Sequence, residues 1–265
     1  MKEESSKDGI SRIFYFVIPW TVPVIVALTT FLFYPVAKST NMIWLPLLVI
    51  YETTLLTYTL VYRKLRGGVF HKERFKLIFK LKGKRLWLQY LLVYGPFIYN
   101  IPLFILNYGM DPAITVQMYV VLALASAING TMEEVFWRAC LEDAGKKTGV
   151  SEKKRLIYAP IAFALWHTAF VIHIYPAGTN WWVFWAIIIV QTWTSGISWL
   201  WVMQKSERLF PQIFYHACAN FLSVFPLLLV SVLGFYFQSS DKGVENERND
   251  IEGAGSRRDQ TRTTR

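Results

Sequence analysis

Long runs of apolar residues dominate the chain, and the charged residues collect in the short stretches between them. Seven of these runs reach about 20 residues, the length that an α-helix needs to cross the hydrocarbon core of a bilayer. The predicted spans are Ile13–Tyr34, Ile43–Tyr62, Leu86–Leu106, Ala113–Asp143, Leu156–Tyr175, Trp181–Met203 and Leu209–Phe237. Pro226 lies inside the last run, which is therefore expected to form one kinked helix or a helix with a short re-entrant piece.

The amino-acid composition indicates the same class of protein. Apolar residues make up 54% of the 265 residues and charged residues only 17%, whereas ordinary globular proteins carry roughly 25% charged residues. So few charges could not cover the surface of a soluble protein of this length, which excludes a soluble enzyme, a disordered chain and a disulfide-stapled secreted domain. The predicted fold is all-α: a polytopic membrane helix bundle with about seven, or eight, transmembrane helices.

The formal net charge of +10 is placed where it sets the orientation of the spans. The loop 63–85 holds ten Lys and Arg against one acidic residue, and further basic residues follow the fourth and sixth spans. The loops expected on the other side contain a single basic residue, Lys38. We therefore predict a multi-pass membrane protein with a cytoplasmic N-terminus, whose basic loops meet anionic lipids rather than nucleic acid. Its compact size and basic loops favour a prokaryotic cell membrane.

Three regions follow from this pattern. Residues 1–112 form an N-terminal three-span region with the basic interfacial loop 63–85, residues 113–237 form the helix bundle with the candidate chemistry, and residues 238–265 form a polar tail predicted to be disordered. Within the loop, Val69–Arg85 mixes apolar and basic residues. It fits a helix lying in the cytoplasmic interface, at about 1 kcal/mol of lipid attraction per basic residue, or a solvated basic loop.

Ionisable residues inside the spans are candidates for function, because a charge at mid-bilayer costs at least ~2.5–3.5 kcal/mol. These residues are Glu52, Glu133, Glu134, Arg138, His167, His173 and His216. Counted from the cytoplasmic loops at 1.5 Å per residue, Glu133, His167 and His216 lie at depths of about 14, 18 and 12 Å. Three antiparallel helices would thus bring one carboxylate and two imidazoles to the same level.

Helical spacing predicts which of these side chains share a face. Glu134 and Arg138 are four residues apart and can form an ion pair along one face. Glu133 is turned about 100° from Glu134 and is left to face the site. His216 and Asn220 are again four residues apart, so both can donate hydrogen bonds from one side of their helix.

Three short motifs resemble those of one family of membrane proteases. Glu133–Arg138 (EEVFWR) resembles the EExxxR motif of the CAAX protease and bacteriocin-processing family, also called CPBP or Abi. Phe163–His167 (FALWH) resembles its FxxxH motif, and His216–Asn220 (HACAN) its HxxxN motif. The motifs stand in the family's order on separate apolar segments, between about residues 113 and 225. The resemblance implies an intramembrane glutamic endopeptidase.

The resemblance also implies a role for each motif residue. Glu133 and His167 would be catalytic and activate a water molecule, and His216 and Asn220 would stabilise the oxyanion of the transition state. Glu134 and Arg138 would support the site. The resemblance implies no metal and no other cofactor. Its substrates would be peptides or membrane proteins, prenylated CAAX proteins or bacteriocin-like peptides among them.

Four alternatives remain open on the sequence. A non-catalytic scaffold or bacteriocin self-immunity protein of the same family could carry the same motifs. One glutamate and two histidines also match a catalytic zinc ligand set, although no HExxH motif is present. Cys140 or Cys218 could serve a thiol mechanism. Finally, Glu52, Glu133 and the histidines could form a proton relay for transport.

Overall fold

The computed structural model describes residues 2–39, 44–65, 74, 76–107, 116–174 and 181–222. These residues are mostly helical and include no β-strand, which confirms the all-α class. The predicted tail 238–265 and the end of the seventh span, 223–237, lie outside the described residues. The helices are α1 (Lys2–Phe16), α2 (Ile18–Ser39), α3 (Trp44–Leu65), α4 (Leu86–Tyr94), α5 (Phe97–Asn107), α6 (Val116–Glu133), η2 (Glu134–Cys140), α7 (Leu141–Lys147), α8 (Glu152–Ile174), α9 (Trp181–Ser206) and α10 (Phe210–Leu222).

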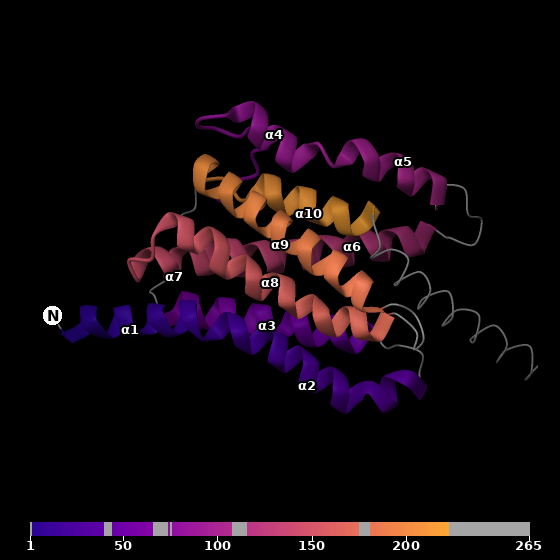
Figure 1. Ribbon diagram of the computed structural model, residues 1–265, viewed down its shortest axis with the longest axis horizontal. Helices are drawn as coiled ribbons and strands as arrows, with labels where there is room; N and C mark the ends of the chain where they lie inside the picture. The colour runs from indigo at the N-terminus through magenta and orange to yellow at the C-terminus, as the bar shows by residue number, and fades with distance from the viewer. Residues whose placement is uncertain are drawn as a thin grey trace, which may run out of the picture.

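The long helices lie side by side in one bundle (Figure 1). Helix α8 packs between α2 and α9, and α6 packs against α10. The short helices α4 and α5 follow one another along the α10 side of the bundle. This arrangement encloses η2, the π-helical continuation of α6, in the interior, where most of its side chains are buried.

The first predicted span is two helices rather than one, with a 44° bend between the Gly9–Phe16 part of α1 and the Ile18–Phe33 part of α2. Pro19 explains the break, because it has no N–H to donate to the preceding turn and its ring clashes with the carbonyl there. The Trp20 N–H next to it donates to the Val17 carbonyl at 3.1 Å, and the carbonyl of Phe16 accepts from the Tyr158 hydroxyl at 2.9 Å instead.

The third predicted span is also divided. Helix α4 ends at Tyr94 and α5 begins at Phe97, with a turn at Gly95 and Pro96 between them. Pro96 cannot donate to the carbonyl of Leu92 as a continuous helix would require. Hydropathy does not detect such a break, because glycine and proline leave the run apolar.

The fourth predicted span continues beyond its expected end at Asp143, because α6, η2 and α7 follow one another without a break as far as Lys147. In η2 the backbone bonds run to the fifth residue back, as from the Leu141 N–H to the Phe136 carbonyl. Such π-helical turns occur often at functional sites. Here the turn carries the Glu134 and Arg138 side chains into the interior.

Aromatic side chains fasten α3 to η2 and α8. The Tyr51 ring stacks on Trp166 with a centroid distance of 3.8 Å, and Trp137 Nε1 donates to the Tyr51 hydroxyl at 3.0 Å. Tyr51 and Trp137 are almost fully buried. The N-terminal region therefore contributes directly to the packing around the candidate motif helix.

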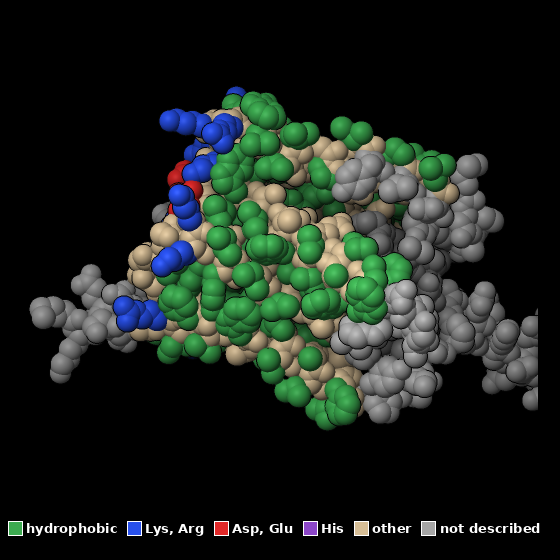
Figure 2. All heavy atoms as spheres, in the orientation of Figure 1, with side chains coloured by type: hydrophobic (Ala, Val, Ile, Leu, Met, Phe, Trp, Pro, Cys, Tyr) green, Lys and Arg blue, Asp and Glu red, His purple; other side chains and the backbone are tan. Residues whose placement is uncertain are grey.

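The outer surface of the bundle is largely apolar. Side chains such as Phe31 and Leu106 are 77% and 80% exposed, and hydrophobic side chains cover much of the face seen in Figure 2. On that face Lys and Arg gather at one end of the bundle, where α7 and the start of α4 lie. Apolar sides with a basic end are typical of a bundle that sits in a membrane.

Length and composition single out one described helix, Trp182–Ser206, as able to cross a bilayer by itself. The bent pair formed by α1 and α2 passes the same test when it is taken as one span. The described residues therefore support a membrane segment but do not confirm seven spans.

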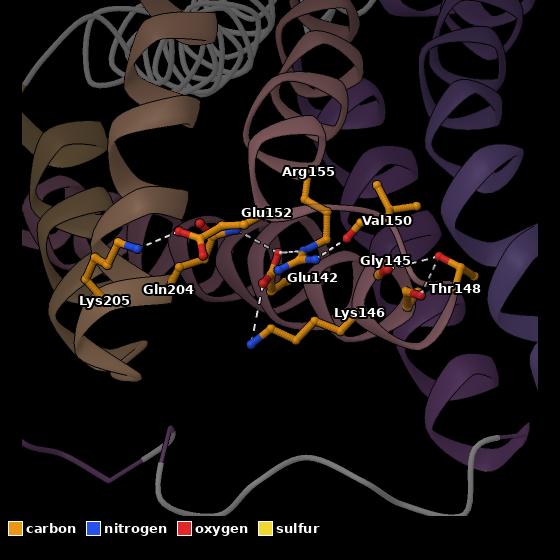
Figure 3. Close-up of polar contacts among 10 residues, drawn as sticks. Glu142, Gly145, Lys146, Thr148, Val150, Glu152, Arg155, Gln204 and Lys205 are labelled. Carbon is orange, nitrogen blue, oxygen red and sulfur yellow. Dashed lines mark hydrogen bonds and ion pairs between the residues drawn. The ribbon is translucent and has the colours of Figure 1, made fainter.

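A polar cluster around buried Glu142 ties α7, α8 and α9 together at the basic end (Figure 3). Glu142 accepts hydrogen bonds from Arg155 Nε at 2.9 Å and from Gln204 Nε2 at 3.0 Å. Lys146 lies 3.5 Å from the same carboxylate, and Lys205 on α9 pairs with Glu152 on α8 at 2.5 Å. Each carboxylate in the cluster faces a cation, so the cluster is suited to holding the helix ends in place.

Of the segment Val69–Arg85 the structure describes residues 74 and 76–85, and residues 76–85 are not helical. It ends in a turn at Gly83, whose φ is +99°, and a side chain there would meet the carbonyl oxygen of Lys205 at 2.6 Å. Buried Gln89 holds this turn by donating to the carbonyls of Lys82 and Lys84 at 3.2 and 2.9 Å. The interpretation of Val69–Arg85 as an interfacial helix is thus wrong for this part, because the chain bends back onto the end of α9.

Candidate functional site

The helices α6 and α10 approach each other closely at the candidate site. A side chain at Gly130 would lie 2.7 Å from the backbone nitrogen of Ala217, so only glycine fits there. Ala217 directly follows His216, and Gly130 lies one turn before Glu134. The close approach therefore brings the first and third motifs into contact.

His216 lies between the two glutamates of the first motif. Its Nδ1 is 2.8 Å from Oε1 of Glu134, and its Nε2 is 3.3 Å from Oε2 of Glu133. All three side chains are at most 8% exposed. A carboxylate oxygen only accepts hydrogen bonds, so a proton on either imidazole nitrogen of His216 points at a carboxylate.

The predicted pair between Glu134 and Arg138 is present. Arg138 Nη1 lies 3.3 Å from Glu134 Oε1, and both side chains are almost completely buried. The guanidinium also lies over the Phe163 ring at 4.2 Å and near the Trp199 ring at 5.4 Å, within range of cation–π attraction. A buried cation needs such compensation, and Glu134 supplies the opposite charge.

His167 on α8 is held with one nitrogen available. Its Nδ1 lies 3.1 Å from the carbonyl oxygen of Phe163. A carbonyl only accepts hydrogen bonds, so Nδ1 carries the proton and Nε2 of the neutral ring is an acceptor. The Trp166 and Phe163 rings pack against the imidazole, with centroids at 4.3 and 5.2 Å.

A cavity of about 510 Å³ brings the second and third motifs together. Its wall includes His167, His216 and Asn220, and Glu133 contacts this wall through His216. The volume lies in the range of small-molecule and peptide sites. The other described residues of the wall belong mainly to α4, α5 and α9 and are mostly apolar or carry hydroxyl and amide groups.

Sequence reasoning missed Asn129, which lies one turn before Glu133 and is 5% exposed. Its Nδ2 donates to Oε1 of Glu133 at 3.2 Å and also to Oε1 of Glu52 on α3. Its Oδ1 accepts from Nδ2 of Asn220. The four-residue spacing to Glu133 is a usable signal, and an amide inside an apolar run is a second one.

The two cysteines lie apart from this arrangement. Cys140 is fully buried in η2, with its Sγ 4.0 Å from the Thr59 hydroxyl, and the cavity wall in the described residues includes neither Cys140 nor Cys218. Within the described residues, no three His, Cys, Asp or Glu side chains are grouped so that they could hold a metal ion.

Comparison with family models matches residues 115–222 to the type II CAAX prenyl endopeptidase Rce1-like family. This part of the chain is similar to that family, and we call it the Rce1-like segment. The match confirms the family resemblance that the three motifs predicted, and it supports a membrane-associated protease. Comparison with curated proteins found no match, and comparison with solved structures found none either.

The Rce1-like segment contains α6, η2, α7, α8, α9 and α10, and hence all three motifs. The site is nevertheless completed from outside it. Glu52 and Tyr51 come from α3, and Leu91 and Asn100 of the cavity wall come from α4 and α5.

Proposed function

We propose that this protein is an intramembrane endopeptidase that hydrolyses a peptide bond with a water molecule activated by Glu133 and His167. The observation that supports this best is the position of His216, which contacts Glu133 and lines the same cavity as His167 and Asn220. Two helices thus supply two imidazoles and an amide to one cavity, and the Glu133 carboxylate of a third helix lies directly behind His216.

In the proposed reaction, the water oxygen attacks the peptide carbonyl carbon as its proton passes to the Glu133 carboxylate, with the acceptor nitrogen of His167 orienting the water. The carbonyl oxygen becomes an oxyanion, stabilised by hydrogen bonds from His216 and Asn220. Collapse of this intermediate breaks the C–N bond, and Glu133 returns the proton to the leaving amine. The products are a carboxylic acid and an amine, and the acid then releases its proton to solvent as a carboxylate.

Glu134 and Arg138 support this site without taking part in proton transfer. Glu134 binds Nδ1 of His216 at 2.8 Å, which fixes the plane of the imidazole. Arg138 in turn balances the charge of Glu134 at 3.3 Å. The arrangement orients the proposed oxyanion donor before a substrate arrives, which is where such donors act most effectively.

The substrate we propose is a peptide or membrane protein of the CAAX type. The cavity wall offers apolar residues such as Leu91, Leu92 and Ile188 and, on α9, the polar side chains Gln191, Ser195 and Ser198. These three are spaced four and three residues apart and form one stripe along α9. We place the polar backbone of the bound peptide along this stripe and its lipid or apolar side chains against the apolar wall.

We further propose a multi-pass protein with a cytoplasmic N-terminus and a basic face on anionic lipids. Lys76, Lys80 and Lys84 of the loop are exposed, and exposed Leu77 and Trp87 lie in the same stretch. Vesicles of phosphatidylserine should therefore bind the protein more tightly than vesicles of phosphatidylcholine. The preference should weaken when these lysines are replaced by glutamine.

Purified protein in detergent, incubated with a prenylated CAAX peptide, provides the direct test. Wild type should release the C-terminal tripeptide, Glu133→Gln should not, and Glu207→Gln, an exposed carboxylate at the basic end, should cleave like wild type. A chelator tests the zinc alternative, since loss of activity restored by zinc would contradict the glutamic mechanism. Cleavage of no peptide, with an unchanged cellular phenotype for Glu133→Gln, would favour the scaffold or immunity alternative.

A further inference from the structure

Asn129 is the one described side chain that hydrogen-bonds both Glu133 and Asn220. We propose that Asn129 is a positioning residue that sets the geometry of the base and the oxyanion donor together, anchored by Glu52. The inference rests on the proposed function, because it gives a shared support to two residues of that mechanism.

The chemistry of its neighbours leaves one orientation for the Asn129 amide. Glu52 and Glu133 present carboxyl oxygens on one side, so the NH₂ group must face them. Both of its hydrogens are then used, and the carbonyl oxygen is left for the amide N–H of Asn220. The amide nitrogen and the carbonyl oxygen of the side chain therefore both have partners.

This orientation fixes both carboxyl oxygens of Glu133. Oε1 is held by Asn129 at 3.2 Å, which directs Oε2 toward His216 at 3.3 Å. Without Asn129 the Glu133 carboxyl group would lose the hydrogen bond from its own helix and would be held only from other helices, by Tyr51 and His216. Asn220, whose side chain lines the cavity, is held on its amide nitrogen by the same residue.

Glu52 connects Asn129 to a third helix. It lies on α3, a different helix from Asn129 and Asn220, and α3 is itself held to η2 by the Tyr51–Trp137 hydrogen bond. An isolated carboxyl group inside an apolar span is costly, so its contact with Asn129 also explains why Glu52 is tolerated there. The network spans three helices and crosses the boundary of the Rce1-like segment.

Asn129→Asp is the sharpest variant, because it keeps the shape of the side chain and the acceptor for Asn220 but removes both donors. We expect kcat to fall at least about tenfold while KM changes less than about twofold, since the substrate does not touch this residue. Ser126→Ala, at another buried position on α6, should have kinetic constants close to those of wild type.

Glu52→Gln in the Asn129→Asp background separates positioning from simple stability. The amide introduced at position 52 can donate to the carboxylate introduced at position 129, so the midpoint of thermal unfolding should recover. That carboxylate still gives no hydrogen to Glu133, however, and kcat should stay low. Recovery of kcat together with stability would overturn the proposal, as would wild-type kcat in Asn129→Asp.

The thermal unfolding of wild type, both single variants and the double variant forms a cycle that needs no turnover. Non-additive midpoints would support the contact between residues 52 and 129, and additive midpoints would overturn it. A wild-type protein that cleaves no peptide would contradict the proposed function, whereas additive midpoints in an active protein would contradict the role of Asn129 alone.

Discussion

Oε1 of Glu134 lies 2.8 Å from Nδ1 of His216, although the two residues are 82 positions apart in the chain. Helical spacing assigns Glu134 only to Arg138, and the structure gives it both partners. The proposed oxyanion donor is therefore tied to the buried ion pair, so a change in that pair should affect both the stability of the protein and the orientation of His216.

Removing either proposed oxyanion donor, His216 or Asn220, should lower turnover more than it weakens substrate binding. For His216→Ala and Asn220→Ala we expect kcat to fall about 10²–10³-fold each, as for other oxyanion donors, with smaller changes in KM. Steady-state kinetics on a prenylated CAAX peptide measure both constants. Unchanged kcat in both variants would remove the oxyanion role.

Substituting Glu133 should affect catalysis, whereas substituting Glu134 should affect stability. Glu133→Gln should abolish cleavage and leave the protein folded, because Arg138 keeps its partner. Glu134→Gln should instead destabilise the protein by about 3–5 kcal/mol, the usual cost of leaving a buried charge unpaired. Thermal unfolding and peptide cleavage of both variants measure the difference.

A second substitution checks the cause of the Glu134 effect. In Glu134→Gln with Arg138→Met, no unpaired cation remains, and stability should return toward that of wild type. If Glu134→Gln is as stable as wild type but inactive, then the assignments of the two glutamates are exchanged.

Gly130 should tolerate no side chain. In Gly130→Ala the new methyl group would meet the backbone of Ala217 at 2.7 Å, so α6 and α10 must move apart. A shift of about 1 Å in a catalytic group can cost about 10² in rate, and we expect a loss of that size. Gly149→Ala is a control for the loss of a glycine remote from the site, because the space around Gly149 is open although its φ is +72°. Wild-type activity in Gly130→Ala would show that α6 and α10 are not held this closely.

The polar stripe on α9, formed by Gln191, Ser195 and Ser198, should strengthen substrate binding. Gln191→Leu and Ser195→Ala remove polar groups from the cavity wall, so KM should rise by about threefold or more for each lost hydrogen bond while kcat changes less. Thr194→Val is a matched control on the same wall, because the Thr194 hydroxyl already bonds the Val190 carbonyl at 2.8 Å. Equal KM values in all three variants would place the peptide elsewhere.

The ion pair at the basic end predicts a pH dependence of stability. The hydrogen bond from Lys205 holds the pKa of Glu152 below its ordinary value of 4.5. A carboxyl group whose pKa is lowered by folding stabilises the protein at pH values above its unfolded-state pKa. This stabilisation is lost as the pH falls through its folded-state pKa. The pair is partly exposed, so its contribution should be at most about 1 kcal/mol.

Thermal unfolding of wild type and Glu152→Gln between pH 7 and pH 3 measures this contribution. The unfolding midpoint of wild type should exceed that of Glu152→Gln at pH 7, and the difference should shrink as the pH falls below 4.5. Lys205→Met should show the same pattern. A difference that is the same at pH 3 as at pH 7 would mean that Glu152 acts through packing rather than charge.

The local features of this protein could be predicted from its sequence. Apolar runs predict helices, and the four-residue spacing of Glu134 and Arg138 predicts their contact, because the helical repeat converts spacing into a shared face. The motif residues were also identified in this way. Breaks inside apolar runs were missed at Pro19 and Pro96, because their effect on the backbone is invisible to hydropathy.

Contacts between helices were decided only by the tertiary structure. Which face of α10 meets α6 depends on how closely the two backbones pack at Gly130 and Ala217, and periodicity within one helix carries no information about this distance. For that reason the position of His216 between two carboxylates, and of Asn129 between Glu133 and Asn220, could not be predicted from the sequence. The sequence by itself determined which polar groups enter the bundle, and the packing of the helices decided which of them meet.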